Sequence, residues 1–280
     1  MPQLSPKSKM MSELDCSWAY PPADLVLNDD EVHVWCASLN QPVSCVERLA
    51  RSLSQEERKR AERFYFAKDR LGFVVRRGLL RTILSYYLDV QPDRIKFRYG
   101  SHGKPELAEM FLRSTLRFNL SHSERLALYA VTRLRSVGVD VEYVRPIADA
   151  AEIVQRYFSP QEKAAFLGLP ASLRLLGFFN CWTRKEAYLK ALGDGLARPL
   201  DAFAVSLAPG ETARLLSIEG NPRDASRWFL QDMVPASGYV AALAVEGRDR
   251  SLACWQWAER TGGEVCSLES NLRGLRYRCS

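Results

Sequence analysis

A chain of 280 residues with 47% apolar residues can bury a large core, as one large domain or two smaller ones. The formal net charge of +6 and the pI near 9.0 favour an anionic partner, such as nucleic acid, a phosphate-rich cofactor or an acidic protein. The seven cysteines are scattered and contain no C-x-x-C pair, so neither a disulfide framework nor a zinc site is indicated.

The N-terminus, MPQLSPKSKMMSELD, is polar and lacks the apolar core of a signal peptide. No apolar run approaches the length of a membrane span. We therefore expect a soluble, unprocessed, cytoplasmic protein. Residues 1–30 show little periodicity and are interpreted as a loose lead-in segment.

The folded part is predicted to start with a strand at EVHVWCASL. Ser54 is the predicted N-cap of a helix in LSQEERKRAERF, because acidic residues follow in the first turn. A longer amphipathic helix is predicted in DRLGFVVRRGLLRTILSYYL, with Arg70, Arg77 and Arg81 along one side.

The same elements recur about 100 residues further along the chain. VGVDVEYV is similar to EVHVWCASL, RYFSPQEKAAF to SLSQEERKRAERF, FFNCWTRKEAYLKAL to GFVVRRGLLRTIL, and DAFAVSL to DRIKFRYG. The repeat predicts two similar α+β halves, residues 31–133 and 134–250, followed by a C-terminal extension over residues 251–280. A cleft between two such halves is a favoured position for a ligand.

Between the halves, RFNLSHSERLALYAVTRLRSVGVDVEYV contains three apolar runs separated by short polar turns. This pattern predicts an antiparallel meander that crosses from one half to the other. GYVAALAVE and ACWQWAER are predicted to form further strands.

The segment GVDVE places Asp140 and Glu142 on one face of an otherwise apolar strand, with Cα atoms roughly 6 to 7 Å apart. Two carboxylates this close repel each other, so we expect a cation between them, most simply a divalent metal. On the downstream helix, Glu186 and Lys190 lie four residues apart and share a face. Taken separately, these features are also typical of a solvated strand face and a surface ion pair.

Together, the three carboxylates form an all-oxygen site that suits Mg²⁺, an ion that usually takes substrate phosphate as a further ligand. No Walker A loop or G-x-G-x-x-G motif is present, so side chains must contact the phosphate. FNLSHS offers Ser121 and His122 at the end of a strand, and the glycine of SHGKP lets a flat ligand approach the backbone. Each of these motifs alone is more often structural than functional.

The ordered set GKP, FNLSHS, GVDVE and WTRKEAYLK resembles the 4′-phosphopantetheinyl transferases of the surfactin-synthetase-activating type, over residues Val32 to Val245. That family has two pseudo-symmetric α+β halves in one chain. The resemblance implies transfer of the phosphopantetheine arm of coenzyme A to a serine of an acidic apo carrier protein, acyl or peptidyl, with release of adenosine 3′,5′-bisphosphate. It leaves open whether the acceptor serves fatty-acid, polyketide or nonribosomal-peptide synthesis.

A duplicated single chain needs no second copy to build its cleft, so we expect a monomer, with no nucleic-acid or membrane partner. The resemblance also implies roles for individual residues. Asp140, Glu142 and Glu186 would bind Mg²⁺, and Lys104 and Pro105 would contact the adenine. Ser121 and His122 would contact the nucleotide phosphates, with His122 at the 3′-phosphate. Lys185 and Lys190 would contact the pyrophosphate, and Arg70 and Arg77 would make further phosphate contacts. Glu186 is the expected base, directly or through a metal-bound water, and the lysines offset charge on the leaving group.

Three other functions stay open on the residues alone. A nucleic-acid-binding module would fit the pI and the Arg-rich helix, but it leaves the carboxylates unexplained. A coenzyme A-binding regulator of the same fold would need none of the chemistry, although all three carboxylates and both helix lysines are present. A Mg²⁺-dependent phosphohydrolase would use a water nucleophile and no acceptor protein.

Overall fold

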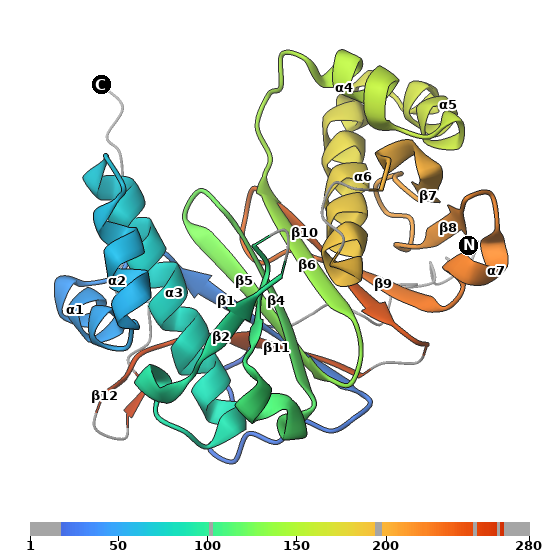
Figure 1. The fold of residues 1–280 in the computed structure, drawn as a ribbon. Helices are drawn as coiled ribbons and strands as arrows, with labels where there is room; N and C mark the ends of the chain where they lie inside the picture. The colour runs from blue at the N-terminus through green and yellow to red at the C-terminus, as the bar shows by residue number, and fades with distance from the viewer. Residues whose placement is uncertain (1–17, 101–102, 194–197, 249–250, 262–263, 266–280) are drawn as a thin grey trace, which may run out of the picture.

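The computed structural model describes residues 18–100, 103–193, 198–248, 251–261 and 264–265. Within them, helices and strands build a mixed α+β fold in two similar halves, as expected (Figure 1). Among these residues, no helix combines the length and the apolar character needed to cross a membrane.

The first half contains a sheet with two short helices and one long helix beside it. Its elements, in chain order, are β1 (Glu31–Ser38), α1 (Val43–Arg51), α2 (Gln55–Glu62), α3 (Ala67–Leu88), η1 (Pro92–Arg94), β2 (Phe97–Tyr99), β3 (Pro105–Leu107), η2 (Glu109–Ser114), β4 (Leu116–Ser123) and β5 (Leu126–Arg133). In its sheet, β1 pairs antiparallel with β5, which pairs antiparallel with β4. β11 (Ser251–Gln256) returns from the end of the chain and pairs parallel with β1.

The second half repeats this arrangement. Its elements are β6 (Val137–Tyr143), α4 (Ala150–Tyr157), α5 (Pro160–Gly168), α6 (Ala171–Leu192), η4 (Leu200–Ala202), β7 (Phe203–Val205), β8 (Leu215–Ile218), α7 (Pro222–Ala225), β9 (Trp228–Met233) and β10 (Tyr239–Glu246). The sheet order β6-β10-β9 matches β1-β5-β4 of the first half. Two further short strands, β12 (Arg260–Thr261) and β13 (Glu264–Val265), pair with each other.

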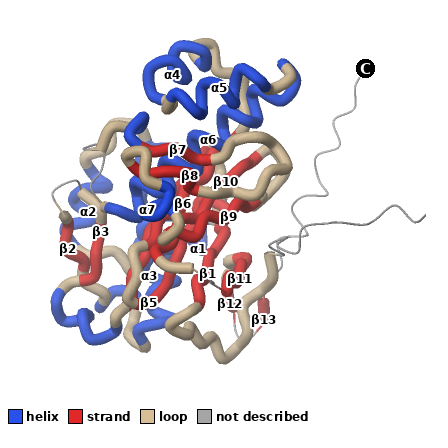
Figure 2. The backbone as a smooth tube through the Cα atoms, turned by 90° about the vertical axis from the view of Figure 1, so that its right-hand side faces the viewer, coloured by secondary structure: helices blue, strands red, loops and turns tan. Residues whose placement is uncertain are grey.

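The two sheets face each other and share a core. Val32, Val34 and Cys36 of β1 pack in the same apolar cluster as the valines of β6. The helices α1 to α3 cover the outside of one sheet and α4 to α6 lie beside the other, each with its own core (Figure 1). Figure 2 shows the same arrangement from the side, with α4 and α5 at the end opposite β11 to β13.

Each half anchors its long central helix through a buried ion pair. In the first half, Ser54 and Glu57 form a capping box at the start of α2, which confirms Ser54 as the N-cap. The same Glu57 carboxylate accepts a hydrogen bond of 2.8 Å from Nε of Arg81 on α3. In the second half, the corresponding residues are Ser159, Glu162 and Lys185.

The predicted three-stranded meander is correct for two strands and wrong for the third. β4 and β5 form an antiparallel hairpin, but β6 pairs with β10 instead of β5. The chain turns away after β5, where Leu134 has a φ of 62°. In this position, the apolar face of β6 packs in the core between the two sheets. If β6 paired with β5 instead, the second sheet would lack its first strand.

The described part of the lead-in segment is ordered, contrary to the expectation. Ala19 forms a parallel bridge with Trp255, and Leu27 packs into the core of the first half. Apolar side chains therefore tie residues 18–30 to the fold, while residues 1–17 lie outside the described residues. The strands predicted at GYVAALAVE and ACWQWAER are present as β10 and β11.

Candidate active site

The close packing of β6 on α6 brings the acidic strand to the helix. A Cβ atom on Gly138 would overlap the carbonyl oxygen of Ala187 and the backbone nitrogen of Ala191. Only glycine fits such an approach of backbone to backbone. Because of this contact, strand and helix side chains line one cavity of about 380 Å³, whose lining consists of Leu120, Ser121, His122, Asp140, Glu142, Trp182, Glu186 and Lys190.

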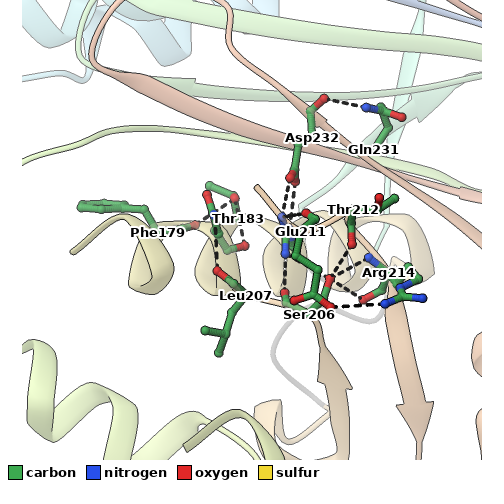
Figure 3. A network of polar contacts seen from close by, with 11 residues as sticks. Phe179, Thr183, Ser206, Leu207, Glu211, Thr212, Arg214, Gln231 and Asp232 are labelled. Carbon is green, nitrogen blue, oxygen red and sulfur yellow. Dashed lines mark hydrogen bonds and ion pairs between the residues drawn. The ribbon is translucent and has the colours of Figure 1, made fainter. Parts of the chain in front are cut away.

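The motif WTRKEAYLK divides between this cavity and the core. Trp182, Glu186 and Lys190 recur every four residues and face the cavity, as helical periodicity requires. The residues between them are buried. Arg184 donates from Nε to Asp232 of β9 at 2.9 Å and from Nη1 to the carbonyl oxygen of Ser206 at 2.6 Å. Figure 3 shows this network on the core side of α6, with Asp232 pointing toward the helix.

Lys185 does not reach the cavity, in contrast to the expected pyrophosphate contact. Its Nζ donates to both carboxylate oxygens of Glu162, at 2.7 and 2.8 Å, and to the carbonyl oxygen of Phe203 at 2.7 Å. These bonds use all three donors of an ammonium group, and only 1% of the residue is exposed. The physical reason is helical geometry, since a residue next to Glu186 points about 100° away from it.

Side chains from alternate positions of β4 bond to β6, strand to strand. There are four such bonds. Asn119 Oδ1 accepts from the backbone N–H of Val139 at 3.0 Å, and Ser121 Oγ donates to Asp140 at 2.8 Å. Ser123 Oγ donates to Glu142 at 2.9 Å and accepts from the backbone N–H of Tyr143 at 3.1 Å. The motif FNLSHS therefore orients the two strand carboxylates. Ser121, expected to contact a phosphate, uses its hydroxyl donor in the hydrogen bond to Asp140.

The three carboxylates destabilise one another. Burial raises the pKa of Asp140, against the opposing effects of Lys190 and Ser121. Burial also raises the pKa of Glu142, and the charge of Asp140 adds to this effect. The pKa of Glu186 is raised by burial, then by Asp140 and Glu142. Their mutual effects place all three groups within electrostatic reach of each other.

A hard cation fits the donor atoms of this cavity. Lys190 Nζ now neutralises Asp140, at 2.5 Å from Oδ1. Within the described part of the chain, no three His, Cys, Asp or Glu side chains are already arranged as a metal site. However, Asp140 Oδ2 is buried and accepts no hydrogen bond, next to two carboxylates with raised pKa values. An unsatisfied carboxylate oxygen in such company is a suitable ligand for Mg²⁺.

A second cavity of about 380 Å³ continues from the first one. The two cavities share Leu120, Glu186 and Lys190. The turn before β3 contributes Gly103, Lys104 and Pro105, and Lys104 Nζ donates to the carbonyl oxygen of Lys190 at 2.5 Å. The structure therefore places the GKP turn beside α6, between the two halves.

Arginines of α2 and α3 form the opposite wall of the second cavity. Arg77 lines it but is buried, with Nε 3.1 Å from Glu57 Oε1. Arg70 is exposed and belongs to neither cavity lining. Arg60 and Arg76 line the cavity and were missed by the sequence reasoning. Phe73, Arg76, Arg77 and Leu80 recur at helical spacing and face the cavity, whereas the predicted stripe of Arg70, Arg77 and Arg81 runs from an exposed to a buried position.

His122 faces the first cavity as a neutral ring at pH 7. Burial of the ring and the positive charges of Arg76 and Lys190 together lower its pKa to about 4. The residue nevertheless keeps a solvent-exposed surface. An anion bound beside it would reverse the effect of these charges and favour the protonated ring.

Comparisons with known proteins identify the family. A model of the 4′-phosphopantetheinyl transferase superfamily matches residues 136–244, and a model of the 4′-phosphopantetheinyl transferase N-terminal part matches residues 40–133. The 4′-phosphopantetheinyl transferase HetI of Nostoc sp. is 45% identical over 234 residues, which cover 84% of this chain and 95% of that protein. The chain belongs to the 4′-phosphopantetheinyl transferase superfamily.

Further relatives agree with this assignment. The transferase is 31% identical to the 4′-phosphopantetheinyl transferase Sfp of Bacillus subtilis over 161 residues, covering 58% of this chain and 69% of that protein. It is 32% identical to a phosphopantetheinyl transferase of Thraustochytrium sp. over 224 residues, covering 75% and 77% of the two chains. The function is therefore transfer of phosphopantetheine from coenzyme A to a carrier protein, and a coenzyme A-binding regulator and a nucleic-acid-binding module are not favoured.

Proposed function

We propose that this transferase depends on Mg²⁺ and that the two contiguous cavities together hold coenzyme A and the metal. The observation that carries the proposal is the junction of the cavities, where Glu186 and Lys190 line both of them. Carboxylates gather on one side of this junction and cationic side chains on the other. A diphosphate with a bound metal needs both kinds of group at one place.

Asp140, Glu142 and Glu186 would hold the ion. Mg²⁺, when bound, would neutralise the pyrophosphate oxygens and offset the charge of three carboxylates whose pKa values are raised chiefly by burial. Ser121 and Ser123 orient the strand carboxylates through their hydrogen bonds. Such outer partners of ligands typically change metal affinity by about 10- to 100-fold when they are removed.

The GKP turn and the arginine wall would hold the nucleotide. Gly103 has a φ of 73°, a backbone conformation that suits glycine. The turn therefore exposes Lys104 and Pro105 toward the second cavity, where a flat adenine ring can lie against them. His122 would contact the 3′-phosphate, because it has a neutral ring that an anion can recharge.

In the proposed reaction, the carrier serine hydroxyl attacks the phosphorus that carries the pantetheine arm. The bond between that phosphorus and the bridging oxygen of the diphosphate breaks, and adenosine 3′,5′-bisphosphate leaves. Glu186, the carboxylate at the junction of the cavities, would take the serine proton, directly or through a water molecule. The ammonium of Lys190 offsets the charge that develops on the leaving phosphate.

We also propose an acidic carrier as the partner and the cytoplasm as the compartment. The net charge of +6 would steer an acidic protein toward the enzyme. Cys36, Cys45, Cys181 and Cys254 are free and buried, as is typical of a reducing compartment. We also propose residues 31–133 and 134–250 as the two structural units, because each family model fits within one of them. Both units lie in one chain, so we propose that the enzyme acts as a monomer.

The release of adenosine 3′,5′-bisphosphate tests the proposed reaction. Purified enzyme is incubated with coenzyme A and Mg²⁺, with and without an apo carrier protein, and the nucleotide is measured by chromatography. We expect release only when the apo carrier is present, in equal amount to the modified carrier. Release from coenzyme A alone would show a hydrolase and contradict the proposed mechanism.

A further inference from the structure

Arg76 differs from the other cations of the second cavity in its neighbours. Arg77 is paired with Glu57, Lys190 with Asp140, and Arg60 lies over the ring of Phe73 at 5.3 Å. Arg76 has no carboxylate within ion-pair distance among the described residues, and Asp69 acts on it only from a longer range. Its half-buried guanidinium therefore has donors available for an anion in the cavity.

Gly72 determines where this guanidinium lies. Gly72 precedes Arg76 by one turn of α3, and side chains on a helix point back toward its N-terminus. A Cβ atom on Gly72 would lie 2.9 Å from Nη1 and 3.7 Å from Cζ of Arg76. The guanidinium thus lies against the bare backbone of Gly72. A glycine inside a helix lowers stability by about 0.5 to 1 kcal/mol relative to alanine. Gly72 therefore leaves room for the guanidinium of Arg76 at the expense of helix stability.

Arg76 lines the second cavity and His122 lines the first, and the two cavities meet at Leu120, Glu186 and Lys190. In agreement with this arrangement, the positive charge of Arg76 is one of the causes that lower the pKa of His122. An arginine near a neutral histidine ring forms a suitable site for a dianion, because the dianion pairs with the guanidinium and favours the protonated ring.

We propose that Arg76, with its guanidinium held over Gly72, binds the 3′-phosphate of coenzyme A together with His122. Arg76 is thereby a specificity residue that distinguishes coenzyme A from dephospho-coenzyme A. This inference rests on the proposed function, in which the cavities hold coenzyme A with its 3′-phosphate at His122. It assigns the phosphate contact to Arg76 in place of Arg70, which lies outside the cavities.

Binding of coenzyme A and of dephospho-coenzyme A, measured by calorimetry in Mg²⁺, tests the inference with four proteins. In Arg76→Gln, we expect the affinity for coenzyme A to fall roughly 10- to 100-fold, with little change for the dephospho form. In Gly72→Ala, the new methyl group displaces the flexible guanidinium, so coenzyme A binds more weakly while thermal stability is kept or increased. Arg156→Gln removes an exposed arginine on α4 outside both cavities and should leave both affinities unchanged.

The double variant Gly72→Ala/Arg76→Gln separates positioning from a general effect on the fold. If Gly72 acts through Arg76, the double variant binds coenzyme A no more weakly than Arg76→Gln alone. Equal losses for both nucleotides in Arg76→Gln, or fully additive losses in the double variant, would overturn the inference. If the wild-type protein itself fails to bind coenzyme A, the proposed function fails first, and the two failures are thus distinguished.

Discussion

Lys190 and Asp140 form an ion pair across the two structural elements of the site, with Nζ 2.5 Å from Oδ1. The other oxygen of the same carboxylate, Oδ2, is buried without a hydrogen bond. In the free protein, the ammonium of Lys190 neutralises Asp140. Glu142 and Glu186 add further negative charge nearby, and the charge of Asp140 contributes to the raised pKa of both groups. The proposed cation would offset this negative charge.

Asp140→Asn should remove activity and keep the fold. Asparagine is nearly isosteric with aspartate and retains an oxygen that accepts the hydrogen bond of Ser121. It removes the negative charge of a carboxyl group whose pKa is raised by burial. We expect transfer to fall at least about 100-fold, while the melting temperature in metal-free buffer is unchanged or higher. Thermal unfolding with and without Mg²⁺ should show stabilisation by the ion in the wild type only. Equal stabilisation of both proteins would argue against Asp140 as a ligand.

Gly138→Ala should unfold the second half. The added methyl group would overlap backbone atoms of α6, which cannot move without disrupting the packing of β6 on the helix. We expect a loss of about 3 kcal/mol or more in the free energy of unfolding, measured in urea. Gly168→Ala is the matched control, because a Cβ there meets no atom within 4 Å, and it should change stability by less than about 0.5 kcal/mol. Similar stabilities for the two variants would contradict the described contact.

Lys185→Met should weaken the fold without changing nucleotide specificity. It leaves the Glu162 carboxylate buried without its cation, a change that typically costs about 3 to 5 kcal/mol. The double variant Lys185→Met/Glu162→Gln should recover part of this loss, because the uncompensated charge is gone. In folded protein, the affinity for coenzyme A should match the wild type. A selective loss of coenzyme A binding at unchanged stability would restore Lys185 as a phosphate contact.

His33 should make stability depend on pH in the acidic range. Burial lowers its pKa from the ordinary 6.5 to about 4, against the opposing charge of Glu31. Between these two values the unfolded chain binds the proton and the folded chain does not. Stability is therefore complete above pH 6.5 and falls as the pH drops toward 4, by about 3 kcal/mol at most.

Urea unfolding at a series of pH values checks this prediction against His33→Gln, which stays neutral throughout. His122 has a similarly low pKa, so the difference between the two proteins isolates the contribution of His33. The wild type should lose more stability than His33→Gln on acidification. Parallel pH profiles would contradict a buried neutral ring at this position.

Much of the fold could be predicted from local patterns. The capping signal at Ser54, the alternating strand at Val137–Tyr143 and the repeated order of elements all follow from propensity and periodicity, which act over a few residues. The pairing of β6 with β10 could not be predicted in this way. Hydrophobic periodicity indicates that a strand has a buried face, but it does not indicate which sheet the strand joins.

The candidate site could be predicted only in part, because periodicity indicates which residues share a face but not what that face contacts. Asp140, Glu142, Glu186 and Lys190 line one cavity, as expected from their strand and helix spacing. Lys185 was assigned to the pyrophosphate by resemblance alone, although its position next to Glu186 directs it into the core. Arg76 carries no motif, and its importance emerges only when the space above Gly72 is known.

Mass measurement of an apo carrier protein during a Mg²⁺ titration tests the carboxylate site most directly. Metal-free enzyme is mixed with coenzyme A and the carrier, and the phosphopantetheine mass increment is followed as Mg²⁺ is added. We predict that the wild type modifies the carrier only when Mg²⁺ is present, and that Asp140→Asn and Glu186→Gln need far more Mg²⁺ or give no product. Complete modification in excess chelator, or unchanged Mg²⁺ dependence in both variants, would contradict a magnesium site formed by these carboxylates.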